Sequence, residues 1–260
     1  MRPGLTFLAL CALPALAMAQ APDHIAMGRA AFDARDPAAA LVHFQAALAQ
    51  DSTSYEANWR GAQAAIDIGK QTPDATKSAS RDSVYALAER YARTAVAANP
   101  NDADGHFILS VAVGRASLTK GKRERVRRAT EIRNEALRAI ELRPTHDGAY
   151  HVLGRWNAEV MRLSGLTRFF AKSFLGGAVF SQASWEHAIQ YMTRAVELDP
   201  PIIQHHLDLA EIYIDRKRYS EARQQLEAIA TLPLKDVMDP RYKESALRLL
   251  RQIEGKRDSR

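Results

Sequence analysis

Cysteine is almost absent from this chain of 260 residues, which contains only Cys11. Cys11 lies in an N-terminal apolar run that we expect to be removed, so the mature chain would have no cysteine. Such a chain cannot build a disulfide framework, bind zinc through thiolates or use a thiol as a nucleophile. The lack of cysteine is compatible with an oxidising compartment. It excludes enzymes with a catalytic cysteine and metal sites whose ligands are cysteine thiolates.

Aromatic residues are also few, at 7% of the chain, and 13 glycines and 11 prolines are sparse for an all-β protein of this length. Alanine dominates the apolar residues instead, and it favours helices because it loses no side-chain entropy in them. A content of 47% hydrophobic and 25% charged residues is normal for a folded globular domain. The composition therefore predicts an all-α fold.

The N-terminal segment has the parts of an export signal. Arg2 supplies a positive start, residues 5–16 form an apolar run, and Ala17-Met18-Ala19 has the small residues of a cleavage site. The run is short for a span of about 30 Å of hydrocarbon. We expect a signal peptide over residues 1–19 and a periplasmic or secreted mature chain; the alternative is an uncleaved N-terminal membrane anchor.

A pattern of small residues recurs through the rest of the chain. Each copy has a small or apolar residue, others four and seven positions later, and in three copies a proline at the twelfth. The spacing keeps one helix face toward a partner helix, and the proline ends the helix. The copies with proline are Ala88, Ala92, Ala95, Pro100; Ile132, Ala136, Ala139, Pro144; and Ala188, Met192, Ala195, Pro200, with variants at Ala40, Phe44, Ala47 and at Ala222, Leu226, Ile229.

A matching first helix precedes each copy, and Gly28 and Ala62 of the first two are 34 residues apart. With Leu153-Gly154 and with Tyr213, Tyr219 and Ala222, the pattern resembles the tetratricopeptide repeat. We predict an array of about five helix pairs over residues 22–234, with long insertions near 70–83, 117–128 and 161–180. A capping helix is expected over 239–254, because an open array end would expose its core, and a disordered tail over 255–260.

The second insertion is strongly basic, with Glu124 as its only acidic residue. Such a stretch is either a solvated helix start or a site for anionic lipid headgroups, since each basic residue near an anionic surface contributes about 1 kcal/mol. An exported chain with one short patch and no interleaved aromatics argues against nucleic acid. The patch consists of Lys120, Lys122, Arg123, Arg125, Arg127 and Arg128.

The third insertion holds four of the eight phenylalanines in the chain, among them Phe169, Phe170 and Phe174. One interpretation is an added helix that enlarges the core. The other is an apolar flap with a basic rim, which Gly176-Gly177 would allow to move. The sequence leaves both open.

The same insertion resembles the regulator of microtubule dynamics family. Leu153-Gly154-Arg155-Trp156, Leu163-Ser164, Phe174 and Gly176 carry the likeness, which extends from about Tyr85 to the capping helix. The resemblance implies a tetratricopeptide fold whose groove, in a member at mitochondrial contact sites, holds and transfers phospholipid. Other members of the family associate with microtubules. Because this chain has an export signal, we do not expect it to bind microtubules.

In such repeats the first helix of each pair would line a concave groove. Positions two before and five after the Leu-Gly leucine are mostly apolar here, which is typical of a site for an apolar partner. Arg155 would meet the negative end of a ligand. The predicted lining consists of Ile25, Phe32, Trp59, Ile66, Phe107, His151, Leu207 and Ile214.

Catalytic and metal-binding motifs are not found. The eight histidines show no HExxH spacing, and Gly114 to Lys122 has the wrong spacing for a phosphate-binding loop. We therefore expect a binding protein without catalysis, metal or cofactor. Its partner would be a lipid or an apolar protein segment, with peripheral contact to an anionic membrane surface. The alternative is a cell-envelope assembly scaffold that binds a partner's helix or peptide.

Overall fold

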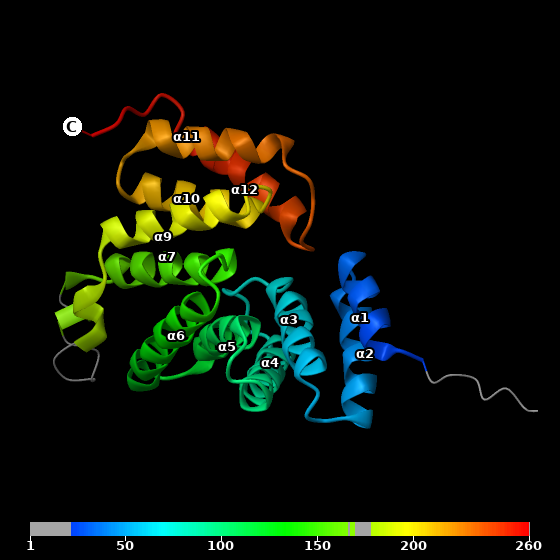
Figure 1. The fold of residues 1–260 in the computed structure, drawn as a ribbon. Coiled ribbons are helices and arrows are strands. Elements are labelled where there is room, and N and C mark those ends of the chain that lie inside the picture. Colours follow the sequence, from blue (N-terminus) through cyan, green and yellow to red (C-terminus); the bar gives the residue numbers. More distant parts are fainter. Residues whose placement is uncertain (1–21, 166, 170–177, 260) are drawn as a thin grey trace, which may run out of the picture.

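The computed structural model describes residues 22–165, 167–169 and 178–259. The chain folds as a succession of helix pairs stacked side by side into a curved array (Figure 1). The pairs are α1 (His24–Asp33) with α2 (Pro37–Gln50), α3 (Tyr55–Lys70) with α4 (Ala79–Ala98), α5 (Ala103–Ala116) with α6 (Lys122–Leu142), α7 (Asp147–Arg162) with α9 (Trp185–Leu198), and α10 (Ile203–Asp215) with α11 (Tyr219–Ala228).

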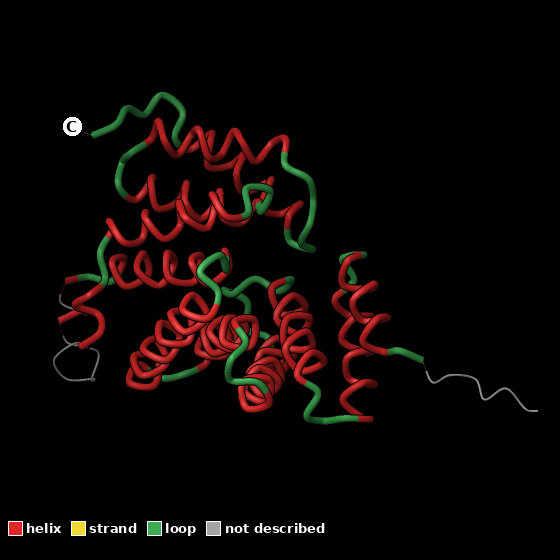
Figure 2. Tube along the Cα trace, viewed as in Figure 1, coloured by secondary structure: helices red, strands yellow, loops and turns green. Residues whose placement is uncertain are grey.

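Short 3-10 turns and one more helix complete the described part, which contains no strand (Figure 2). The turns are η1 (Ser117–Thr119), η2 (Ala178–Gln182) and η3 (Ile229–Thr231), and the last helix is α12 (Asp239–Gln252). This arrangement confirms the predicted all-α repeat fold of five pairs and a terminal helix.

Small residues let the two helices of a pair approach closely. A Cβ atom on Gly28 would lie 2.5 Å from Cε1 of Phe44, and one on Gly154 would lie 3.1 Å from the backbone nitrogen of Met192. The alanines of the repeating pattern, such as Ala88 and Ala195, are fully buried. Larger side chains there would push the helices apart, because protein interiors are close-packed.

Polar residues and prolines define the helix ends. Asp36 accepts a hydrogen bond from the backbone nitrogen of Ala39 at 2.9 Å, and Ser184 accepts one from that of His187 at 3.0 Å. These side chains satisfy amides that have no partner within the helix. At the other end, the second helices of the middle pairs stop two residues before Pro100, Pro144 and Pro200, as expected for a residue that cannot continue a helix.

The first two insertions are partly helical. The first comprises the loop 71–78 and the start of α4, and Arg81 organises it. Its buried guanidinium donates hydrogen bonds to the carbonyl oxygens of Pro73 (2.9 Å), Asp74 (3.2 Å) and Thr76 (2.7 Å). The second comprises η1 and the first turns of α6, which lengthen that helix. The third runs from the end of α7 to η2, and its residues 166 and 170–177 lie outside the described part.

The tail, expected to be disordered, instead lies along α10 and α11 as far as residue 259. Gly255 adopts a φ of 68°, a left-handed conformation that suits glycine and turns the chain back after α12. Arg223 then donates to the carbonyl oxygen of Lys256 at 3.2 Å, and Ser220 N–H donates to Asp258 at 2.8 Å. The tail was expected to be disordered, but its polar groups find hydrogen-bond partners on α11 and at Lys217.

Candidate functional site

The basic stretch and the phenylalanine-rich insertion, far apart in the sequence, meet at one corner of the array. Val126 of α6, Trp156 and Val160 of α7, and Phe180 of η2 form a separate buried cluster, which we call the α6–α7 corner. The rings of Trp156 and Phe180 pack edge to face with centroids 6.0 Å apart. The indole nitrogen of Trp156 donates to the carbonyl oxygen of Ala129 at 2.7 Å, which ties α7 to α6. Figure 1 shows the start of α6 and the segment after α7 at the same edge of the molecule.

Much of the positive charge at this corner is neutralised within the protein. Arg128 pairs with Glu89 of α4 at 2.8 Å and with Glu124 at 2.9 Å. Arg125 donates to the carbonyl oxygen of Leu118 at 2.6 Å. Glu124 is the only acidic residue within the stretch itself, and Glu89 of α4 adds a second carboxylate from another helix.

Four basic residues of the patch are exposed to solvent. They are Lys120, Arg123, Arg125 and Arg127, and the side chain of Arg127 is 76% exposed although it pairs with Glu124 at 2.7 Å. Hydrogen bonds from Arg127 and Arg128 lower the pKa of Glu124 to about 2, so this carboxylate stays ionised in the physiological range. Lys122 begins α6, but its side chain lies outside the described part.

Exposed apolar side chains lie at the same corner. Phe169 is 58% exposed, Leu163 is 36% exposed and Leu118, in η1, is 37% exposed. Phe180, by contrast, is 7% exposed and belongs to the buried cluster. The described part of the insertion therefore contributes both to the core and to the surface, and the flap interpretation stays a prediction. Phe170 and Phe174 of the predicted flap lie outside the described residues.

The predicted groove residues are not brought together as one lining. Phe32, Trp59, Ile66 and Phe107 pack in or against the core of the first three helix pairs. Leu207 and Ile214 belong to the separate core of the last pairs, where Leu207 is 5% exposed. Ile25 is half-buried on α1. The first helices of neighbouring pairs pack against each other in this array. Most of the predicted groove side chains therefore contact other helices of the array instead of lining one common groove.

Arg155, predicted to meet the negative end of a ligand, is paired with an acidic residue of the array, although its side chain is 41% exposed. Its Nη1 donates to both carboxylate oxygens of Asp208 on α10 at 3.0 Å. Although burial opposes ionisation, Arg155 and His151 hold the pKa of Asp208 well below its ordinary value. Arg155 belongs to a stripe of ionisable residues that joins α7 to α10 and that the sequence reasoning missed. The signal was there: such residues recur every three or four positions at Asp147, His151, Arg155, Glu159 and Arg162 on α7, and at His205, Asp208, Glu211 and Asp215 on α10.

A second buried ion cluster joins α3 to the segment before α12. Lys70 lies 2.6 Å from Asp67 and 3.1 Å from Asp236, and the side chains of Lys70 and Asp67 are 11% and 7% exposed. Burial raises the pKa of Asp67 to about 6. Arg241 of α12 adds a hydrogen bond of 2.6 Å to the carbonyl oxygen of Gln71. The C-terminal helix is thus fastened to the second repeat.

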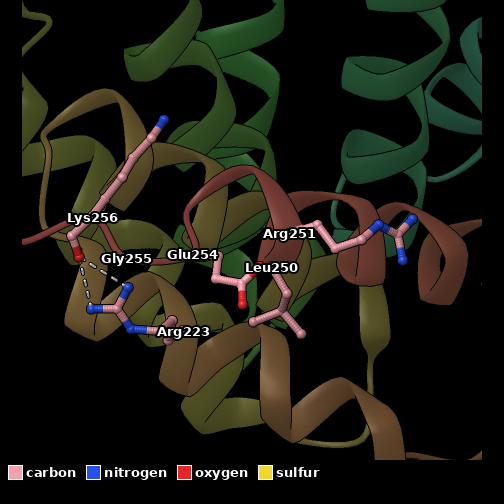
Figure 3. Close-up of a pocket in the computed structure, with 6 residues that line it drawn as sticks. All are labelled: Arg223, Leu250, Arg251, Glu254, Gly255 and Lys256. Carbon is pink, nitrogen blue, oxygen red and sulfur yellow. Dashed lines mark hydrogen bonds between the residues drawn. The ribbon is translucent and has the colours of Figure 1, made fainter.

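An open hollow of about 470 Å³ lies between α11, the end of α12 and the tail (Figure 3). Arg223, Arg251 and Lys256 give it positive charge, Glu254 is its acidic residue, and Leu250 is apolar. Arg223 is already engaged with the backbone of the tail, as the dashed lines in Figure 3 show. Arg251 remains exposed.

The described residues contain neither a metal-binding cluster nor a membrane-spanning helix. No group of three or more histidine, cysteine, aspartate or glutamate side chains there has the arrangement of a metal site. In the same residues, no helix has both the length and the apolar character needed to cross a bilayer.

Comparison with known proteins identifies the family of this chain. The sequence model of the family described as Regulator of microtubule dynamics protein 1-3 matches residues 28–254. The chain belongs to this family. It is 27% identical over 177 residues to Regulator of microtubule dynamics protein 3 of Rattus norvegicus, covering 67% of this chain and 36% of that protein. It is 25% identical over 208 residues to Regulator of microtubule dynamics protein 1 of Bos taurus, covering 80% of this chain and 64% of that protein.

The chain therefore spans about a third to just under two thirds of the length of these relatives. Among solved structures it is similar to TTC0263, a thermophilic tetratricopeptide-repeat protein of Thermus thermophilus, with a TM-score of 0.59, 20% identity and coverage of 86% of this chain and 97% of that one. It is also similar to PilF of Pseudomonas aeruginosa, with a TM-score of 0.51, 16% identity and coverage of 89% and 91%. At these identities the likeness shows the tetratricopeptide fold alone.

Proposed function

We propose that this member of the regulator of microtubule dynamics family is a binding protein without catalytic chemistry of its own. Its α6–α7 corner binds a partner that is apolar and negatively charged, and anionic phospholipid at a membrane surface has that chemistry. The groove first inferred from the sequence is replaced in this proposal by a surface site. Residues 1–19 act as an export signal, so the membrane is met from the periplasmic or extracellular side.

One observation carries the proposal: the basic start of α6 and the apolar insertion share a buried cluster. Val126 lies between Arg125 and Arg127 in the sequence and packs with Phe180, so the charged helix start and the insertion cannot lie far apart. Lys120, Arg123 and Arg127 are exposed at the start of α6, and Leu163 and Phe169 are exposed on the insertion. Apolar side chains that insert below the headgroups, combined with cations that meet phosphate, are the two terms of interfacial membrane binding.

Vesicle co-sedimentation tests this proposal. The chain from residue 22 should bind vesicles that contain phosphatidylglycerol and bind pure phosphatidylcholine much more weakly. Neutralising Lys120→Gln with Arg123→Gln should weaken binding about thirtyfold, since each cation contributes about 1 kcal/mol. The matched control is Arg35→Gln with Arg248→Gln, which removes equal charge at exposed sites elsewhere in the array. Equal loss in both pairs would show unspecific attraction, and no binding by the wild type would reject the proposal.

A second candidate partner is a peptide segment of another cell-envelope protein, as in an assembly scaffold. The hollow of Figure 3 favours it, because exposed Arg251 stands beside Leu250 in a concave setting that suits an acidic peptide end. In a pull-down from an envelope extract, a specific partner should survive detergent delipidation and be lost with Arg251→Glu. Recovery that is unchanged by Arg251→Glu would exclude the hollow as its site.

A further inference from the structure

The contact between α7 and α10 is made by a continuous row of ionisable side chains. His205 Nε2 lies 2.9 Å from Asp147 Oδ2, and His205 Nδ1 lies 2.8 Å from His151 Nδ1. His151 Nε2 lies 3.0 Å from Asp208 Oδ2, and Asp208 is held by Arg155. We call these five residues the α7–α10 relay. Its two histidines and Asp208 are each less than 10% exposed, at 8%, 4% and 6%.

The number of protons in the relay follows from its geometry. An ionised carboxylate only accepts hydrogen bonds, so the ring nitrogens that face Asp147 and Asp208 must both carry hydrogen. The contact between the two Nδ1 atoms needs one more hydrogen, supplied by either ring. Three hydrogens on two rings make one imidazole cationic and the other neutral. With Arg155, two positive charges then balance the two carboxylates.

A fourth proton cannot be accommodated in this arrangement. Both Nδ1 atoms would carry hydrogen and face each other at 2.8 Å, and two cationic rings would stand with centroids 4.8 Å apart. Burial, with the neighbouring His205 acting in the same direction, lowers the pKa of His151 to about 4. In an opened joint the ring would meet water and titrate near its ordinary pKa of about 6.5.

Among the described residues, no other side chain makes a hydrogen bond or ion pair with the two rings. His146 acts on Asp147 from the start of α7. Glu159 of α7 forms an ion pair with Arg155. Burial raises the pKa of Glu211 on α10 and of Tyr242 on α12, and the negative charge of Asp208 raises both further. The remaining charged groups are thus directed at the carboxylates and Arg155. The two histidines depend on each other.

We propose that the α7–α10 relay is a proton-controlled joint, in which uptake of one further proton between about pH 6.5 and pH 4.5 loosens α10 from α7. The closed relay carries one charged ring, whereas both rings of an opened joint become charged below about pH 6.5. The opened state therefore binds more protons than the closed state only between about pH 6.5 and about pH 4, and acid favours opening in that range. Each pH unit in that window shifts the opening equilibrium by up to about tenfold. The joint is independent of which partner the α6–α7 corner binds.

Hydrogen exchange of the whole chain from residue 22 tests the joint. After correction for the intrinsic pH dependence of exchange, amides of α10 should open up to about tenfold more per pH unit from about pH 6.5 to pH 4.5, with α4 amides as the reference. His205→Gln removes one titrating ring and should flatten this dependence. His206→Gln is the matched control, because His206 is equally buried but bonds to Gln225 and the carbonyl oxygen of Pro200.

A flat profile in the wild type would overturn the proposal, as would loss of the pH dependence in the His206 control. Should the His205 variant fail to fold, nitrogen NMR of the wild-type histidine rings decides instead. One charged and one neutral ring at neutral pH support the joint. Two neutral rings, or two charged rings in a closed junction, contradict it.

Discussion

Lys70 Nζ lies 3.1 Å from Asp236 Oδ2, although the two residues are 166 positions apart in the chain. Lys70 ends α3 in the second helix pair, and Asp236 precedes the C-terminal helix α12. A contact between them exists only because the stacked pairs curve and bring the end of the array back to its beginning. In a repeat array each repeat ordinarily contacts only its neighbours, so this ion pair is a long-range contact that the stacking of neighbouring pairs does not supply.

Replacing Lys70 by methionine should therefore destabilise the protein strongly. Asp67 would be left buried without its cation, and removing one partner of a buried pair costs about 3–5 kcal/mol. The change is measured as the free energy of unfolding in urea, with Lys77→Met as the control at an exposed lysine. A double variant Lys70→Met with Asp67→Asn should recover part of the loss. Equal stabilities of the Lys70 and Lys77 variants would show that the cluster contributes nothing.

Phe180 and Phe169 should respond differently to truncation, although both belong to the third insertion. Phe180→Ala removes a buried ring from the α6–α7 corner and should cost about 3–5 kcal/mol. Phe169 is 58% exposed, and Phe169→Ala should change stability by less than about 0.5 kcal/mol. Thermal unfolding of both variants distinguishes the core part of the insertion from its surface part. A large loss in the Phe169 variant would mean that its ring is part of the core.

Arg155→Met should destabilise the junction of α7 with α10 in a pH-dependent way. Arg155 helps to keep the pKa of Asp208 below its ordinary value, so the ionised Asp208 contributes stability that is present above about pH 3.8 and is lost as the pH falls further. The deficit of the variant should be largest at neutral pH and should shrink as the pH falls, because Arg155 also lowers the pKa of His151 and because Asp208 of the unfolded chain is protonated below about pH 3.8. Urea unfolding across this range measures it, and a deficit independent of pH would point to lost packing by the arginine stem instead.

The repeat architecture was predictable because each helix pair carries its own signal. Ala88, Ala92 and Ala95 lie on one face by spacing alone, and Pro100 marks the end of their helix, so the phase of the array can be counted along the chain. The same local reasoning found the basic stretch and the insertion. It did not place Val126 against Phe180, because that contact depends on how α6 and α7 cross.

The contacts missed from the sequence are those that join distant segments. Glu89 of α4 forms an ion pair with Arg128 and so lowers the net positive charge of the basic patch. Asp208 of α10 forms an ion pair with Arg155, and Asp236, near the far end of the array, forms one with Lys70. Each depends on the curvature of the stack, which the pattern of one repeat does not reveal. The ionisable stripes of α7 and α10 could have been recognised, since a helix side that repeats charged residues every three or four positions often faces a partner of the same kind.

The absence of cysteine beyond Cys11 allows the central claim to be tested at single positions. A chain that starts at residue 22 can carry one introduced cysteine with a polarity-sensitive fluorophore, either as Phe169→Cys at the α6–α7 corner or as Leu247→Cys on α12. Both sites are comparably exposed, at 58% and 54%. Added phosphatidylglycerol vesicles should shift the emission of the label at position 169 to the blue and leave the label at 247 unchanged. No shift at 169, or equal shifts at both positions, would contradict a membrane-binding corner.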